Sequence, residues 1–541
     1  MNAATSGRAP NVFRAGEWIP MRSYELDDPV DFLVIGTGAG GGTLVGRLAE
    51  AGFRVVALEA GPFWRPLDEF ASDEKEQQKL YWSDERITGG DDPIQFGSNN
   101  SGRGVGGSTV HFTMVSLRFR PEWFRSRSLL GYGLDWPLTY DDLEPYYREV
   151  EQAMKIAGPV RYPWGPPRGR YPYRPHEVNA AGLILARGCR RLGIEWVPAP
   201  LATLSAPRGE AHPCVYRGFC IIGCSTNAKQ SVLVTWIPRA IRAGAEIRDN
   251  AMATRIESGE DGRVTGVLYH RDGKWHRQRA RHVVVAAYSI ETPRLLFNSA
   301  TNRFPNGLAN SSGAVGRSLM VHSNDGVWAT FDEEIRSYKG PPVMAITEHW
   351  NYHDEGKNFF GGYQFGSQGP LPMEWGKKLA TVRGLWGMDL RREAAANYIH
   401  SAGFKMVGEV EPRDDNRVEL AGEKDALGLP IPRITFSYSE NDKRLIEHAR
   451  RFMAETMNAA GGRDIWFESD TAHLVGACRM GDDARTSVTD SFGRTWDIPN
   501  LWICDGSLFP TSGGVNPSET IQALACRTAD RMIDLGRRGE L

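Results

Sequence analysis

Residues 31–42, DFLVIGTGAGGG, and residues 54–60, RVVALEA, decide the fold of this chain. The first stretch is a short apolar run that continues into glycines, and an amphipathic stretch separates it from the second apolar run, which ends at Glu59. Short apolar runs bounded by turn residues predict buried strands, and the stretch between them predicts a helix. The two stretches therefore predict a β–α–β unit within an α/β fold.

The glycines of this unit predict a dinucleotide site. Gly36, Gly38 and Gly41 form GxGxxG between the first strand and the helix, and Glu59 follows the last of them by 18 positions. The first glycine permits a tight turn, the second lets a pyrophosphate approach the backbone, and Glu59 can accept a hydrogen bond from a ribose hydroxyl. FAD and NAD share this fingerprint, and glycines that only pack a helix on a sheet are the simplest alternative.

A second glycine cluster, GRGVGGST, occupies residues 102–109. Backbone without side chains can lie close to a flat ring or a phosphate, although the same residues could form a flexible loop. The cluster alone therefore does not choose between the two cofactors.

The bulk composition indicates a globular protein with a small-molecule partner. A chain of 541 residues is too long for one hydrophobic core and predicts two domains or an interleaved pair. With 64 basic and 66 acidic residues the net charge is -2, so no global field would attract nucleic acid. The first 24 residues contain no signal-peptide core, and no apolar run is long enough to predict direct membrane insertion.

Distant segments contribute to the predicted sheet. HVVVAA at 282–287 and NLWICD at 500–505 both predict strands, so the domains are expected to be discontinuous in sequence. Two stretches rich in Pro and Gly, RYPWGPPRGRYPYRP at 161–175 and GSQGPLPMEWG at 366–376, are expected to run over the surface.

Together these segments resemble the glucose-methanol-choline (GMC) oxidoreductase family. The similar elements occur in the family's order, and they are DFLVIGTGAGGG, GRGVGGST, YSIETPRLLFNSA at 288–300, HLVGACRMG at 473–481 and NLWICDGSLFPTSGGVNPSETIQALA at 500–525. Tyr288 and Ala300 depart from the small residues or glycine usual in the third element. The resemblance implies the GMC fold, in which a Rossmann-like FAD-binding domain faces a substrate domain built on an antiparallel sheet. It places the FAD-binding domain at 25–118, 211–320 and 465–541, and the substrate-binding domain with its excursions at 119–210 and 321–464.

The resemblance also implies the catalytic pair. His473 matches the general base, which takes the hydroxyl proton as hydride leaves the same carbon; one histidine without this match would more often be structural. Asn516 matches the second catalytic position, where an amide can hold the substrate oxygen. Asn516, Pro517 and Glu519 also have the pattern of a helix N-terminus, with Asn516 as the N-cap.

The positions that match the family's FAD contacts are Gly36, Gly38, Gly41, Glu59, Arg103, Gly106, Gly107, Ser108, His111, Asp505, Gly506 and Pro517. His111 resembles the histidine that pyranose-oxidase-like members join covalently to the flavin, and related dehydrogenases keep a similar histidine without that bond.

Three of the seven cysteines, Cys214, Cys220 and Cys224, are spaced C-x5-C-x3-C. Thiolates bind iron and zinc well. The spacing is similar to that of bacterial FAD glucose dehydrogenase, gluconate dehydrogenase and glucoside 3-dehydrogenase subunits, where such cysteines hold a 3Fe-4S cluster. Zinc with His212 as a further ligand and buried structural thiols are the alternatives.

The sequence thus predicts an FAD-dependent enzyme that oxidises a CH–OH group of a sugar, glycoside or polyol. Electrons would leave through the cluster to an external acceptor such as a cytochrome c subunit, and a signal-bearing small subunit could carry the chain to the periplasm from the cytoplasm. The main alternative is a cluster-free, pyranose-oxidase-like enzyme that reduces O2 to H2O2. A lyase that uses FAD without net oxidation and a non-catalytic flavoprotein are more distant alternatives, and the presence of both His473 and Asn516 argues against the latter.

Overall fold

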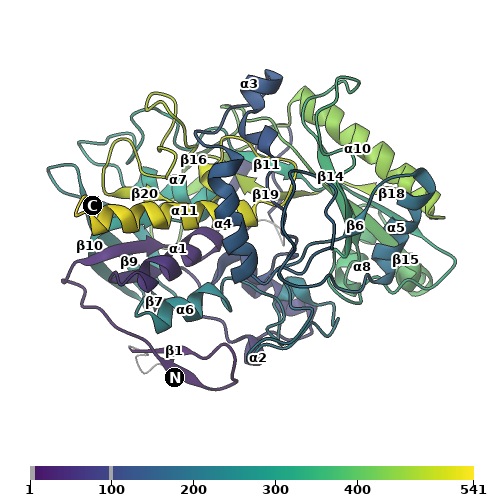
Figure 1. Ribbon diagram of the computed structural model, residues 1–541, viewed down its shortest axis with the longest axis horizontal. Coiled ribbons are helices and arrows are strands. Elements are labelled where there is room, and N and C mark those ends of the chain that lie inside the picture. Colours follow the sequence, from purple (N-terminus) through teal and green to yellow (C-terminus); the bar gives the residue numbers. More distant parts are fainter. Residues whose placement is uncertain (1–6, 97–100) are drawn as a thin grey trace.

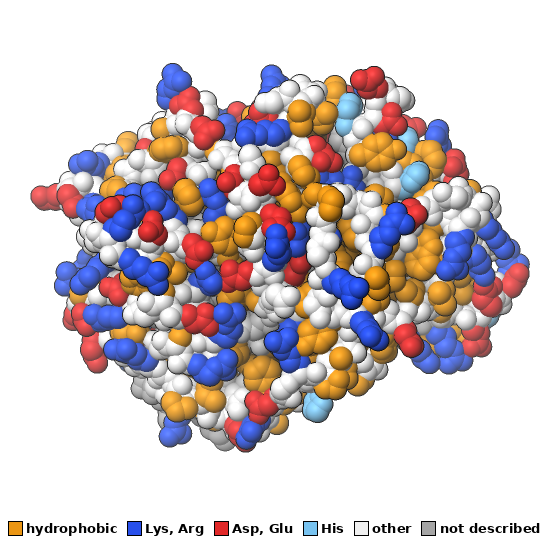
Figure 2. Space-filling model, in the orientation of Figure 1, with side chains coloured by type: hydrophobic (Ala, Val, Ile, Leu, Met, Phe, Trp, Pro, Cys, Tyr) orange, Lys and Arg blue, Asp and Glu red, His pale blue; other side chains and the backbone are white. Residues whose placement is uncertain are grey.

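The computed structural model describes residues 7–96 and 101–541, so the first six residues of the N-terminal segment assessed for a signal lie outside it. Two large sheets lie side by side in Figure 1, with the mixed, mainly parallel one at the left and the antiparallel one at the right. Among the described residues, no helix is long and apolar enough to cross a membrane. Figure 2 shows acidic and basic side chains intermixed over the visible face, in keeping with the net charge of -2.

The first sheet contains the predicted β–α–β unit. Its order is β7–β4–β3–β10–β9–β8, with β20 beside β10. The strands are β3 (Val30–Ile35), β4 (Val55–Leu58), β7 (Glu246–Arg248), β8 (Met252–Ser258), β9 (Val264–Arg271), β10 (Lys274–Val285) and β20 (Leu501–Ile503). The strands β7, β4, β3, β10 and β20 pair in parallel, whereas β8 and β9 continue β10 as an antiparallel meander. The predicted strands at 31–35, 54–59, 282–287 and 500–505 are therefore confirmed, and segments far apart in sequence complete one sheet.

Helices α1 (Ala39–Glu50), α6 (Trp236–Arg242) and α11 (Ser518–Arg537) pack together beside this sheet, and α4 (Tyr140–Ala153) crosses α11 (Figure 1). Helix α7 (Tyr288–Asn298) packs on β8. Gly46 of α1 lies against Trp236, where an added Cβ would be 3.1 Å from the indole ring. This close approach lets α1 and α6 cover the sheet together.

The second sheet is antiparallel throughout, as the resemblance implies, with the order β18–β12–β15–β14–β13–β6 and with β11 joining β15 to β19. Its strands are β6 (Val197–Pro198), β11 (Met320–Ser323), β12 (Gly326–Thr330), β13 (Ala345–Thr347), β14 (Tyr363–Gln368), β15 (Ser401–Gly408), β18 (Arg463–Glu468) and β19 (Thr471–Val475). Helices α5 (Ala180–Leu192) and α10 (Glu440–Ala459) pack on it through a second hydrophobic core. Helices α8 (Pro372–Thr381) and α9 (Gly387–Asn397) pack on each other, and Trp375 of α8 packs on Trp328 of β12.

The remaining described elements are small. They are the ribbon of β1 (Arg8–Pro10) and β2 (Trp18–Pro20), the sheet of β5 (Ile87–Gly89), β16 (Arg417–Lys424) and β17 (Pro430–Thr435), the helices α2 (Pro66–Glu69) and α3 (Ser126–Leu130), and short 3-10 segments at Glu74–Leu80, Gly107–Val110, Pro121–Phe124, Cys220–Ile222, Tyr398–His400 and Gly506–Leu508.

One of the two predicted surface excursions is wrong. Residues 366–368 end β14, between β13 and β15 inside the antiparallel sheet, and α8 begins at Pro372. Gly366 is buried there, and Pro372 takes a position in the first helical turn where its missing N–H costs nothing. Glycine and proline are therefore used inside regular elements here. Residues 161–175 contain no helix or strand, as expected, although Tyr171 is buried.

Candidate active site

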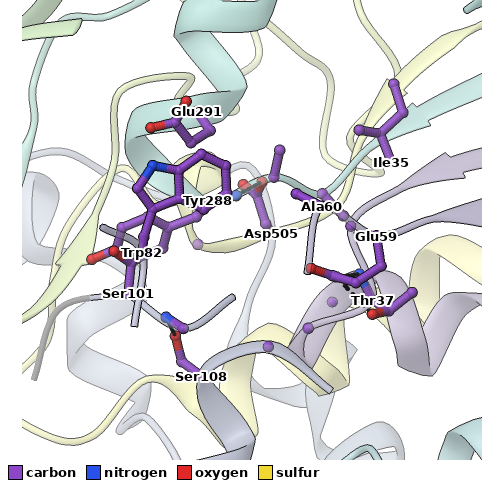
Figure 3. A pocket seen from close by; sticks show the side chains of 18 of the residues that line it. Ile35, Thr37, Glu59, Ala60, Trp82, Ser101, Ser108, Tyr288, Glu291 and Asp505 are labelled. Carbon is purple, nitrogen blue, oxygen red and sulfur yellow. Dashed lines mark hydrogen bonds between the residues drawn. The ribbon is translucent and has the colours of Figure 1, made fainter. Parts of the chain in front are cut away.

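A cavity of ≈ 200 Å³ lies at the carboxyl ends of the parallel strands. It is lined by residues of the first glycine loop, the end of β4, the second glycine cluster, the start of α7 and the turn after β20. Figure 3 shows Thr37 and Glu59 side by side at one end, Trp82 and Tyr288 at the other, and Asp505 between them. Ligands of open α/β sheets bind at this edge of the strands.

The two glycine segments meet at this cavity. Gly36 has φ +95°, and an added Cβ would lie 2.3 Å from the Ala286 carbonyl oxygen, so no other residue fits that turn. An added Cβ on Gly107 would lie 2.7 Å from Gly38 Cα, so the second cluster packs directly on the first. Helix α1 begins after Gly38 without a side-chain cap and without an acidic residue in its first turn. Its N-terminal N–H groups are therefore suited to a pyrophosphate.

Glu59 connects these segments. One carboxylate oxygen accepts from the N–H and hydroxyl of Thr37, at 3.1 and 2.7 Å, and the other accepts from the N–H groups of Gly61 and Gly104, both at 3.1 Å. Burial raises the pKa of Glu59 from its ordinary value, and these hydrogen bonds oppose the shift. The acid thus positions both glycine loops in addition to lining the cavity.

Asp505 performs a similar task at the other side. It accepts hydrogen bonds from the N–H of Tyr288 at 2.9 Å, from the Thr292 hydroxyl at 2.6 Å and from the Ser507 N–H at 2.8 Å. The Tyr288 hydroxyl is buried and has no partner among the described residues. A buried hydroxyl without a partner is costly, so its place at the cavity fits a polar ligand there.

The other predicted FAD contacts divide between the cavity and its surroundings. Gly36, Gly38, Gly107, Ser108, Gly506 and Pro517 line the cavity with Glu59 and Asp505. Three others lie behind it: Gly41 packs on the Gly36 carbonyl, Gly106 donates to the Thr37 hydroxyl at 3.3 Å, and Arg103 pairs with Asp84 at 3.0 Å. His111 lines a neighbouring cavity; its buried Nε2 has no partner in the described chain, and burial lowers its pKa to about 3.

That neighbouring cavity, of ≈ 150 Å³, lies between the glycine cluster and the antiparallel sheet. Ser108, His473 and Ser518 line both cavities, so the two spaces meet at these residues. The other polar side chains around the second cavity are Thr113, Asn324, Gln364, Gln368, Glu374, Lys405 and Asn516. A lining so rich in hydrogen-bonding groups suits a ligand with several hydroxyls.

A β-bulge aims His473 at the meeting point. Along β11 and β19, Val321 pairs with Leu474 and His322 pairs with Ala472, which leaves His473 as the extra residue on β19. His473 has φ +50°, in the left-handed region that non-glycine residues avoid. Bulges and such backbone strain recur at functional sites because they redirect one side chain.

The structure brings His473 and Asn516 together. Asn516 Nδ2 lies 3.2 Å from His473 Nε2, and His322 Nδ1 lies 3.2 Å from His473 Nδ1. Burial, and secondarily the neighbouring His322, lowers the pKa of His473 to about 3, so the imidazole is neutral near pH 7. A neutral imidazole is the form that a general base requires.

Asn516 does not cap the following helix. Helix α11 begins at Ser518 with Pro517 in the N-cap position, and no side chain caps it. The Asn516 amide instead contacts His473 and, at 3.2 Å, Gln364. The expected capping role is therefore wrong, because the helix starts later and these partners engage the amide.

The three cysteines lie within residues 214–224, a segment with one 3-10 turn at Cys220–Ile222, and Ile221 of this segment lines the second cavity. Burial raises the pKa of the Cys220 thiol to about 12; Lys229 opposes this shift, and the nearby Cys214 and Cys224 contribute to it. Buried Lys229 donates to the carbonyls of Val110 and Cys220, both at 2.8 Å, and so joins the second glycine cluster to this loop. The thiols are suitable metal donors in kind, but the described residues contain no group of three or more His, Cys, Asp or Glu placed to hold a metal.

Sequence reasoning missed His322, Gln364 and Lys229. His322 lies in VGRSLMVHS, a stretch with no cue other than the histidine. Gln364 stands between Tyr363 and Phe365, and Lys229 lies in the polar stretch STNAKQS at 225–231, so neither is distinguished by its sequence context. A buried histidine, glutamine or lysine becomes informative only when its partners are known.

A cavity at the carboxyl edge of a Rossmann-type sheet, joined to a polar cavity with a neutral histidine, is the arrangement of a cofactor-dependent oxidoreductase. Profiles described as GMC oxidoreductase match residues 30–324 and 412–525. The chain belongs to the GMC oxidoreductase family, and it is an FAD-dependent enzyme that oxidises alcohols. The cavity, the free N-terminus of α1 and the unpartnered Tyr288 hydroxyl fit FAD.

Relatives align along almost the whole chain. The 2-methyl-1,2-propanediol dehydrogenase of Mycolicibacterium austroafricanum is 34% identical over 93% of this chain and 95% of its own length. The fructose dehydrogenase large subunit of Gluconobacter japonicus is 30% identical over 94% of this chain and 98% of its own. A formate oxidase variant of Aspergillus oryzae has a similar fold, with a TM-score of 0.69 and 14% identity over 96% of this chain and 100% of that structure.

Proposed function

We propose that this chain oxidises a CH–OH group of a sugar, glycoside or polyol, with His473 as the general base and Asn516 holding the substrate oxygen. The observation that carries this proposal is the position of the pair, because His473 lies where the nucleotide cavity meets the polar cavity and Asn516 lines the latter. A substrate held there has its hydroxyl at the base and its carbon toward the cofactor side.

In this mechanism the chain handles the proton and the geometry. His473 Nε2 accepts the hydroxyl proton, and Asn516 Nδ2 donates to the oxygen as negative charge develops on it. FAD bound in the larger cavity supplies the oxidant, since its flavin accepts the hydride that leaves the same carbon. Ser108 and Ser518, which line both cavities, border the path between the two reacting centres.

The substrate class is supported by the cavity and by the relatives. Gln364, Gln368 and Asn324 place amides around the second cavity, where they can hold additional hydroxyls. Two relatives carry names of a diol dehydrogenase and a fructose dehydrogenase. A polyhydroxy substrate is therefore a better match than a long apolar alcohol.

The test is anaerobic reduction of the bound flavin by a panel of monosaccharides, glycosides, gluconate and 2-methyl-1,2-propanediol. We expect bleaching of the flavin bands by at least one hydroxylated compound. If no compound in the panel reduces the flavin of a fully FAD-loaded protein, the proposed function is wrong.

A second proposal concerns the exit of electrons. We propose that Cys214, Cys220 and Cys224 bind a 3Fe-4S cluster that passes electrons to an external acceptor. This proposal is supported by the presence of three thiols in one segment and by Lys229, which joins that segment to the glycine cluster. In the part of the chain that the structure describes, the thiols are not arranged to hold a metal.

Metal analysis after anaerobic purification tests this second proposal. We expect about three irons per chain and loss of iron in Cys220→Ser. Cys189→Ser, in the buried face of α5, is the matched control and should keep the iron. Zinc or no metal would exclude the cluster and favour the alternative, an oxidase that reduces O2 to H2O2. Rapid reoxidation of the reduced flavin when air is admitted, with formation of peroxide, would identify that oxidase.

The finer assignments follow from the same proposals. We propose a small subunit and a cytochrome c acceptor as partners, which the name of the fructose dehydrogenase large subunit supports. The chain would act in the cytoplasm, or in the periplasm if a partner exports it. We also propose the FAD-binding division at 25–118, 211–320 and 465–541; within it β19 pairs with β11 of the antiparallel sheet, so the last part serves both cavities.

A further inference from the structure

His322 lies behind His473 and lines neither cavity. It is on β11, is fully buried, and its ring meets the His473 ring edge-on with the centroids 5.3 Å apart. Its Nδ1 lies 3.2 Å from His473 Nδ1, and its Nε2 lies 2.9 Å from the Gly513 carbonyl oxygen. The two histidines thus share a contact between like nitrogen atoms, which is possible only if one carries a proton and the other a lone pair.

The carbonyl decides which nitrogen carries the proton. Gly513 O can only accept, so His322 Nε2 must donate to it. Burial lowers the pKa of His322 to about 4, and a neutral imidazole carries a single N–H. His322 Nδ1 therefore carries a lone pair and accepts a hydrogen bond from the Nδ1–H of His473.

The proton on His473 Nδ1 determines which nitrogen of this ring is basic. Since neutral His473 carries its proton on Nδ1, its Nε2 presents a lone pair toward Asn516 and the cavity. The Asn516 amide agrees with this arrangement, because its oxygen accepts from Gln364 Nε2 at 3.2 Å and its Nδ2 is left to donate to His473 Nε2. From Gly513 to Gln364, each contact then joins one donor to one acceptor.

We propose that His322 is a positioning residue that holds His473 in the tautomer with a basic Nε2. This inference rests on the proposed function. In the reaction the substrate hydroxyl proton moves to His473 Nε2, the carbon–hydrogen electron pair leaves as hydride to the flavin, and the carbon–oxygen bond becomes a carbonyl. The imidazolium formed keeps its Nδ1–H donated to His322, so the positive charge is stabilised by a chain that ends at the Gly513 carbonyl.

Without His322 the base loses its orientation. A His473 ring with no acceptor at Nδ1 can carry its proton on Nε2, where it would donate to the substrate oxygen and could not remove a proton. The wrong tautomer of a catalytic histidine is known to cost several orders of magnitude in rate in other enzymes.

Two amide substitutions separate the roles of the two nitrogens. His322→Asn places an amide oxygen near the position of Nδ1 and retains an acceptor for His473, but loses the contact with Gly513. His322→Gln reaches the position of Nε2 and retains the contact with Gly513, but offers no acceptor near Nδ1. Both variants carry the same amide group, and neither side chain extends further than that of histidine. Each variant is therefore a structural control for the other.

The experiment is anaerobic flavin reduction by the best substrate of the panel, measured on FAD-loaded native protein and both variants, with FAD content and Tm recorded on the same samples. We expect His322→Gln to slow reduction roughly 100-fold and His322→Asn to recover about 10-fold or more of that loss, because orientation of a base is worth this much. Equal slowing in both variants, or a native rate in His322→Gln, would overturn the inference and leave His322 a structural residue. If no compound reduces the flavin of the native protein, the proposed function is wrong, and the inference fails with it. If the flavin of the native protein is reduced but both variants are equally slow, only the inference about His322 is wrong.

Discussion

Replacing His473 with alanine removes the proposed base and leaves the rest of the site in place. Burial lowers the pKa of His473 to about 3, so near pH 7 almost every molecule has a neutral ring with one nitrogen lone pair. General-base assistance typically contributes 10²–10⁴ to a rate, so we expect His473→Ala to slow flavin reduction by roughly 10²-fold to 10⁴-fold. FAD should stay bound, because the hydrogen bonds of Glu59 and Asp505 do not involve this histidine.

The effect on stability should be small in comparison. The substitution leaves His322 Nδ1 without its donor and Asn516 Nδ2 without one acceptor. A buried polar group left without a partner costs about 1–3 kcal/mol, and water can lower this cost because His473 borders two cavities. For a chain of this size we expect Tm to fall by about 2–4 °C at most.

The assay is stopped-flow reduction of the flavin without oxygen, with FAD content and Tm measured on each preparation. His270→Ala on β9 is the matched control, since its ring contacts Trp275 and lines neither cavity. We expect the control to reduce at the native rate. A His473→Ala protein that holds FAD and reduces within about threefold of native would remove His473 from the mechanism.

Three further predictions follow from the contacts of the site. Glu59→Ala should weaken FAD retention and leave the reduction rate of the FAD-loaded protein unchanged, because it releases both glycine loops far from the base. Glu59→Gln keeps one acceptor oxygen, so its FAD affinity should lie between those of the native protein and Glu59→Ala. Unchanged FAD affinity in both variants would contradict this prediction. Asn516→Ala should slow reduction by roughly 10-fold to 10²-fold with little change in Tm, since Asn516 does not cap α11, and a Tm loss without a rate loss would show a structural role. The pKa values of His473 and His322 are lowered in the folded state, so the unfolded chain binds protons at these residues first as pH falls. The contribution of these two residues to stability should be full above about pH 6.5 and decline toward pH 4 by about 1.4 kcal/mol per pH unit for each histidine. Denaturant unfolding at pH 7 and pH 5 checks this, and His473→Ala should show a shallower decline than the native protein.

Much of the nucleotide half could be predicted because its signals are local. An apolar run, a tight glycine turn and a helix are consecutive in sequence, so β3, α1 and β4 follow from residues 31–59 without knowledge of the rest. Glu59 was also predicted at the cavity. Its contact with Gly104 was not, because that contact joins residues 45 positions apart.

The catalytic half was predictable only through family resemblance. No local pattern distinguishes His473 from the other histidines of the chain, and Asn516 with Pro517 looked like a helix cap, whereas the structure directs its amide to His473 and Gln364. The stretch at 366–376 misled for a related reason: glycine and proline usually mark loops, but pairing with β15 makes residues 366–368 part of a buried strand.

The sequence by itself determined the dinucleotide-binding unit, the family and the identity of the groups that can act as base and as thiol ligands. Only the tertiary structure decided that His322 faces His473 across 151 positions, that Lys229 joins the cysteine loop to the glycine cluster, and that His473 lines both cavities. The physical reason is that strand propensity, turns and helix starts depend on neighbouring residues, whereas the direction of a hydrogen bond and the tautomer of a buried ring depend on partners brought together by the pairing of β11 with β19.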